Sequence, residues 1–156
     1  MANPFYRLQV AALVDAFCAL DEMVEELKAD KLHPERIHAM ALSKHAEELL
    51  QKVDTIALPK SARRAGRDVG DFAYLMAELL KPYGELEEDR AKLPTVREVR
   101  KYVETKDPDV TVLIDKEAFE KVELYQAKAR ETIRKPAKDY GQSCEKPLDS
   151  ISFDSN

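Results

Sequence analysis

Residues 3–31 read NPFYRLQVAALVDAFCALDEMVEELKADK, and this stretch decides the fold of the chain. Asn3 followed by Pro4 is typical of a helix start, because an asparagine side chain caps free amides and proline needs no amide hydrogen there. Apolar residues then recur every three or four positions from Phe5 to Leu27. The pattern predicts an amphipathic helix of roughly 40 Å at 1.5 Å per residue. An apolar stripe of that length requires partner helices of similar length.

Three further stretches have the same spacing and supply those partners. Pro82 is expected to end one of them, and Thr95 with Glu98 forms a capping box that opens a shorter helix. The expected helices cover residues 34–55, 60–81 and 108–134, with the short helix at about 95–105. Residues 110–114, VTVLI, are β-branched as strands often are, but no pairing partner is evident, so we expect helix there as well.

We therefore predict an all-α fold: an antiparallel up-down bundle of four long helices with a short fifth helix and an irregular C-terminal tail. Four glycines, no tryptophan and 35% charged residues favour such a helical protein. Residues 1–135 are expected to form the bundle domain. Residues 136–156, rich in proline, serine and aspartate, are expected to form the tail.

Net charge and cysteine content limit the partners and the location. The net charge of −5 disfavours nucleic acid and anionic membranes as partners. No apolar stretch approaches the roughly 18 residues that a membrane span needs. Cys18 and Cys144 form no CxxC motif, which indicates reduced thiols and a cytoplasmic protein; a cross-link between these two cysteines is the alternative.

A row of small residues lies along the expected helix at 60–81. A glycine inside a helix costs roughly 1 kcal/mol relative to alanine, so something close to the backbone must offset that cost. We expect this to be the backbone of the first helix, which carries a small row of its own, and a ligand touching the glycines is the alternative. The residues expected to pack closely are Ala62, Gly66, Gly70 and Ala73 in one row and Ala12 and Ala16 in the other.

Charges in the first and third helices oppose the preference set by the helix dipole. Acidic residues gather at the end of the first helix, and basic residues gather at the start of the third. Antiparallel helices would turn this into one basic and one acidic end of the bundle. The alternatives are internal screening, association with a partner or another copy, or binding of a phosphate or carboxylate. The anion-binding candidates are Lys60, Arg63, Arg64 and Arg67.

Motifs that carry catalysis or bind cofactors do not occur in this sequence. There is no Gly-rich phosphate loop, GxSxG, HExxH or CxxC. His38, His45 and Glu48 follow one another at helical spacing and are the candidate metal ligands, but no residue can be assigned to complete the site. We therefore expect neither a metal nor a cofactor.

The leading functional hypothesis is a small intracellular interaction or assembly protein that self-associates and has no catalytic activity. The alternative is a helical bundle that binds an anion or a nucleotide, and such a bundle could be an enzyme. It would use the Lys60–Arg67 cluster to hold a phosphorylated small molecule.

Overall fold

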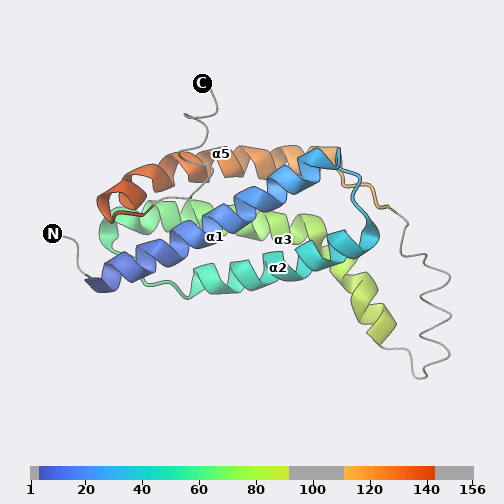
Figure 1. Cartoon of the computed structure of the whole chain (residues 1–156), viewed down its shortest axis with the longest axis horizontal. Coiled ribbons are helices and arrows are strands. Elements are labelled where there is room, and N and C mark those ends of the chain that lie inside the picture. The colour runs from blue at the N-terminus through green and yellow to red at the C-terminus, as the bar shows by residue number, and fades with distance from the viewer. Residues whose placement is uncertain (1–3, 92–110, 143–156) are drawn as a thin grey trace.

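The computed structural model describes residues 4–91 and 111–142 (Figure 1). The described helices are α1 (Pro4–Ala29), α2 (Arg36–Asp54), the short 3-10 helix η1 (Lys60–Ala62), α3 (Arg63–Ala91) and α5 (Lys116–Asp139). The four α-helices pack against one another, which confirms the all-α prediction. The short helix expected at 95–105 and most of the expected tail lie outside the described residues.

Consecutive long helices run in opposite directions, as Figure 1 shows. Two contacts confirm which helix ends meet: the Gln9 side chain accepts a hydrogen bond from the Ala57 amide at 3.2 Å, and Gly141 lies next to the Arg7 guanidinium. The starts of α1 and α3 and the end of α5 therefore share one end of the molecule. We call this the basic end and the opposite one the acidic end.

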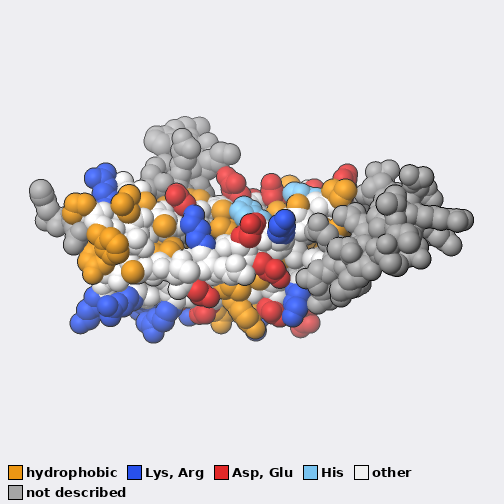
Figure 2. Space-filling view, turned by 90° about the horizontal axis from the view of Figure 1, so that it is seen from below, with side chains coloured by type: hydrophobic (Ala, Val, Ile, Leu, Met, Phe, Trp, Pro, Cys, Tyr) orange, Lys and Arg blue, Asp and Glu red, His pale blue; other side chains and the backbone are white. Residues whose placement is uncertain are grey.

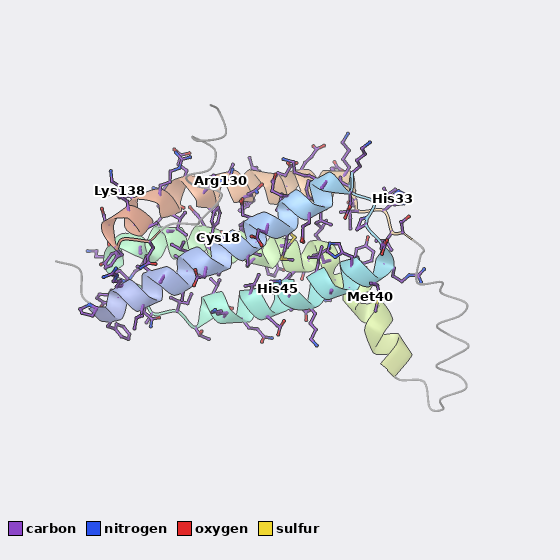
Figure 3. The ribbon with its side chains drawn as sticks, viewed as in Figure 1. Cys18, His33, Met40, His45, Arg130 and Lys138 are labelled. Carbon is purple, nitrogen blue, oxygen red and sulfur yellow. The ribbon has the colours of Figure 1, made fainter. Side chains whose placement is uncertain are left out.

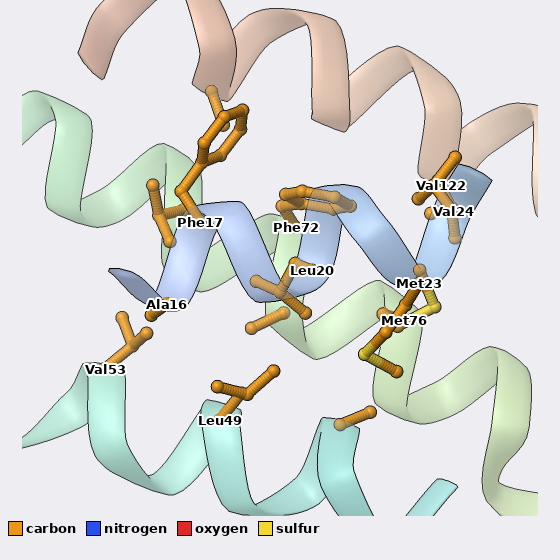
Figure 4. Close-up of a cluster of buried hydrophobic side chains, with 14 of the residues drawn as sticks. Ala16, Phe17, Leu20, Met23, Val24, Leu49, Val53, Phe72, Met76 and Val122 are labelled. Carbon is orange, nitrogen blue, oxygen red and sulfur yellow. The ribbon is translucent and has the colours of Figure 1, made fainter. Parts of the chain in front are cut away.

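The core is built around α3, which packs most extensively on α2 and α5. The rings of Phe17 in α1 and Phe72 in α3 meet edge to face with centroids 6.0 Å apart. Leu20, Met23 and Met76 are fully buried around them (Figure 4). The apolar stripe of α1 is thus covered from Val10 to Leu27, whereas Phe5 and Leu8 at its start are exposed.

Three glycines of α3 lie against α2 and the loop that follows it. A Cβ atom at Gly66 would overlap a methyl carbon, one at Gly70 would be in ordinary contact at 3.8 Å, and one at Gly84 would lie 2.7 Å from a hydroxyl oxygen. The neighbours are, in the same order, Leu58, Val53 and Ser43. The glycines therefore do allow close packing, but their partner is α2 and its loop, not the first helix as the sequence analysis expected.

The end of α3 differs from the prediction. The helix was expected to stop at Pro82, yet it continues to Ala91. A helix accommodates an internal proline by giving up one backbone hydrogen bond and bending. Contact between Gly84 and Ser43 keeps the helix on α2 just beyond the proline, and its last turns then point away from the bundle (Figure 1).

The described part of segment 110–114 is extended, so the prediction that the last helix begins at 108 was wrong. The Val112 amide donates to the Pro34 carbonyl at 2.9 Å, and the Ile114 amide donates to the Leu32 carbonyl at 2.8 Å. The β-branched residues thus pair with the connection between α1 and α2. This partner was not evident from the sequence, because Leu32 and Pro34 lie where one expected helix gives way to the next.

Side chains complete this junction at the acidic end. Thr111 forms an isolated antiparallel bridge with Glu35, and its hydroxyl lies 2.8 Å from Nε2 of His33. Asp115 then caps α5 by accepting a hydrogen bond from the Glu117 amide at 3.2 Å. The cap explains why α5 begins directly after the extended segment.

Tyr83 ties α3 to the same extended segment. Its hydroxyl donates to the Leu113 carbonyl at 3.1 Å. Partial burial raises the pKa of Tyr83 above its ordinary value of 10.0, and the negative charge of Asp115 raises it further.

Replacing Tyr83 with Phe should make stability less sensitive to alkaline pH. Because the folded pKa is the higher one, the unfolded chain loses the phenol proton first, and the stability that neutral Tyr83 contributes is lost as the pH rises above 10.0. Urea denaturation between neutral pH and pH values above 10.0 should show a shallower decline for Y83F than for wild type. The exposed Tyr74→Phe control should keep the wild-type slope; equal slopes for all three would contradict the assignment.

Two polar contacts join α5 to its neighbours. Asp21 of α1, 4% exposed, accepts hydrogen bonds from Gln126 at 2.6 Å and from the Arg130 guanidinium. Asp68 of α3 is also buried and lies 3.9 Å from the Lys128 ammonium group. The Asp21 cluster is the stronger of the two, because a buried carboxylate with two donors resists separation of the helices.

Replacing Asp21 with Ala should lower the free energy of unfolding by about 2–4 kcal/mol, because Gln126 and Arg130 then lose a buried acceptor. The matched control is Asp15→Ala, at an exposed position of the same helix, which should stay within about 0.5 kcal/mol of wild type. Urea denaturation followed by circular dichroism measures both. Equal effects would show that the cluster adds no stability.

One cysteine prediction was also wrong. Cys18 on α1 is disulfide-bonded, whereas the sequence analysis expected reduced thiols (Figure 3). Cys144, the other cysteine of the sequence, lies outside the described residues. The thiol argument for a cytoplasmic location therefore fails at Cys18.

Candidate functional site

A groove of about 910 Å³ lies between the end of α2, the loop after it and the first turns of α3. One face of α3 lines it from Arg63 to Tyr74, a length of about 16 Å at 1.5 Å per residue. The lining positions on α3 are three or four residues apart, which places them on one side of the helix. The groove is thus as long as three helical turns.

The floor of the groove is apolar. Leu50, Ile56 and Leu58 are half-buried there and leave part of their surface open to a ligand. At Gly66 and Gly70 no side chain projects, so the backbone of α3 itself is accessible. Close packing with α2 and an open groove therefore depend on the same two glycines.

The lips of the groove carry charges of both signs. Arg63 and Arg67 stand one turn apart on α3, Asp71 follows one turn later, and Asp54 lies on the α2 side. All four side chains are exposed, and none forms a hydrogen bond or ion pair with another residue in the described ranges. Their charges are therefore available to a partner.

Tyr74 closes the α3 side of the groove at the end away from Arg63. Its side chain is 53% exposed. Tyrosine provides a large apolar surface with a polar tip, which is why it is enriched at protein interfaces. An exposed tyrosine on an apolar floor gives this groove an anchor for binding.

The four predicted anion-binding residues separate into two pairs. Arg63 and Arg67 line the groove, whereas Lys60 and Arg64 are exposed outside its lining. Figure 2 shows basic side chains gathered near the basic end of the molecule, and Lys138 of α5 lies at that end in Figure 3.

The alanines that were predicted to pack closely lie in the core or at its edge. Ala16, Ala62 and Ala73 are buried in the core, and Ala12 is half-buried. They do not line the groove; of the predicted small residues, only the two glycines do.

The candidate metal ligands are not brought together. Nε2 of His38 lies 3.8 Å from a carboxylate oxygen of Glu26, and His45 is exposed on α2 (Figure 3). Among the side chains that the structure describes, in residues 4–84 and 111–142, no three His, Cys, Asp or Glu are placed so that they could hold a metal ion. His38, His45 and Glu48 thus form no shared site.

No protein-family model, curated protein or solved structure matches this chain. Among the described helices, none combines the length and apolar character that crossing a membrane requires. Function is therefore inferred from the groove and from the distribution of charge.

At a protein concentration too low for two copies to associate, replacing both Arg63 and Arg67 with Gln should leave the free energy of unfolding within about 0.5 kcal/mol of wild type, because neither arginine has a partner to lose within the described part of its own chain. Arg130→Gln is the matched comparison and should cost about 1–3 kcal/mol, because it removes a charged donor from buried Asp21. Urea denaturation separates the two cases. A large loss in the double variant would assign the groove arginines to folding and not to binding.

Proposed function

We propose that the protein is a small helical-bundle interaction protein that self-associates and has no catalytic activity. The gathering of basic side chains at one end is the observation that carries this proposal. These exposed side chains come from α1, η1, α3 and α5: Arg7, Lys60, Arg63, Arg64, Arg67, Arg134, Lys135 and Lys138. In the part of the chain that the structure describes, none of them has a carboxylate within ion-pair distance.

The acidic end supplies the complementary charge. Its exposed carboxylates come from the end of α1, the start of α5 and the loops beside them: Glu25, Glu26, Asp30, Glu35, Asp115 and Glu117. Three exposed lysines at the same end offset part of this charge: Lys28, which lies 3.7 Å from Glu25 and 3.6 Å from Glu123, Lys31 and Lys116. Complementary potentials steer association, so two copies with opposed ends attract one another.

A second candidate function is binding of an anionic small molecule, which the positions of Arg63 and Arg67 favour. Their guanidinium groups are unpaired, exposed and one helical turn apart on one lip of the groove. Arginine holds carboxylate and phosphate groups through two parallel hydrogen bonds. A phosphorylated or carboxylated ligand would place its anionic group there.

The proposal includes the finer architecture. The complete chain is taken as an antiparallel bundle of four long helices, extended by the short helix expected at 95–105 and by a C-terminal tail. The proposed function does not depend on a cytoplasmic location. The disulfide at Cys18 is typical of proteins in oxidising compartments.

Native mass spectrometry and sedimentation velocity should show an assembly of at least 35.6 kDa, twice the 17.8 kDa of one chain. Raising sodium chloride from about 0.05 M to about 0.5 M should weaken it, because salt screens exposed charges. A retained ligand mass that is lost in an R63E/R64E variant, with the assembly intact, would favour the second candidate. A 17.8 kDa species at every salt and protein concentration would contradict self-association.

A further inference from the structure

The groove between α2 and α3 carries two positive and two negative side chains, and this balance restricts its occupant. Arg63 and Arg67 are matched by Asp54 and Asp71. A ligand that carries only positive or only negative charge would be repelled by the two groove side chains of the same sign. A second copy of the chain would not, because a twofold axis brings the same surface patch together from both subunits and can place each arginine opposite an aspartate.

We propose that two copies associate through this groove about a twofold axis near Gly70, with their α3 helices antiparallel. The inference rests on the proposed self-association, for which it names the surface. In an antiparallel pair whose axis passes midway between Arg67 and Asp71, one residue before Gly70, Arg67 of each copy lies opposite Asp71 of the other. The axis generates this ion pair twice, and neither residue has a competing partner among the residues described.

Glycine at the centre of the contact permits the close approach that the arrangement needs. Gly70 lines the groove without a side chain of its own, and Gly66 lies one turn before it. Helix backbones can approach closely where no Cβ intervenes. At Gly66 the place of the missing side chain is taken by Leu58, whereas at Gly70, of the residues that the structure describes, only Val53 comes within 4 Å of that place, so Gly70 is the position that leaves room for a second α3.

Tyr74 fills the space that two facing grooves would otherwise leave. In the same register residue 74 of one copy faces residue 64 of the other, so Tyr74 lies within one helical turn of both Arg63 and Gly66. Its half-exposed ring can cover the apolar floor at Gly66, and a guanidinium over a tyrosine ring adds a cation–π contact.

Charge reversal at two positions tests the arrangement. Arg67→Asp places Asp opposite Asp71 of the second copy, and Asp71→Arg places Arg opposite Arg67. Each variant alone should dimerise at least about tenfold more weakly than wild type, because two attractive pairs become repulsive. An equimolar mixture of the two variants should restore a dimer, because every pair is then opposite in sign. Native mass spectrometry identifies this heterodimer by its mass.

Two further variants separate this surface from a general charge effect. Lys81→Asp makes the same charge change on the same helix, outside both the groove lining and the basic end, and it should dimerise like wild type. Tyr74→Ala should weaken the dimer without changing any charge. Circular dichroism establishes that each variant keeps its helical content, and all the substituted side chains are exposed.

The outcomes distinguish this inference from the proposed function. If wild type self-associates and both charge reversals leave its mass unchanged, the groove is not the interface and self-association stands. If both variants are monomeric and their mixture is monomeric too, the paired geometry is wrong. If wild type itself is monomeric at every concentration, the proposed function fails and the inference with it. A heterodimer from two weakly associating variants is the supporting result.

Discussion

Three glycines of α3 face α2 and its loop, and they let side chains of that neighbour come close to the α3 backbone. At Gly66 and Gly84 a side chain would overlap or crowd its neighbour. A helix that contains several glycines is costly by itself, so its formation depends on the packing that the glycines permit. Because α3 also packs on α1 and α5, its position against α2 affects the packing of the core as well as the shape of the groove.

Helical periodicity was sufficient to predict the helical class and the regions of the long helices, because burial of an apolar stripe is a local property. Their ends were harder to predict. Pro82 indicated a stop, yet packing of Gly84 on Ser43 favours continuation of α3 beyond it. Residues 111–115 needed a partner that only the tertiary structure supplies, namely the backbone of Leu32 and Pro34.

The candidate site was predictable in part. Local charge density drew attention to Arg63 and Arg67, and the glycine spacing drew attention to Gly66 and Gly70. Asp71 and Tyr74 were missed, although their spacing from Arg67 places them on the same face of α3. Asp54 had no such signal, because only folding brings the end of α2 to this groove. Reading one helix face as a whole would have recovered most of the site.

The separation of positive and negative groups along the bundle affects how two copies of the protein rotate before they touch. A body with such a charge distribution has an electric dipole moment along its long axis, and the field of a neighbour exerts a torque on it. Two diffusing molecules therefore turn towards opposed orientations within the distance at which ions leave their fields unscreened, about 8 Å at physiological salt. Fewer collisions are then wasted in unproductive orientations, so the layout of charge influences how fast copies meet as well as how firmly they hold.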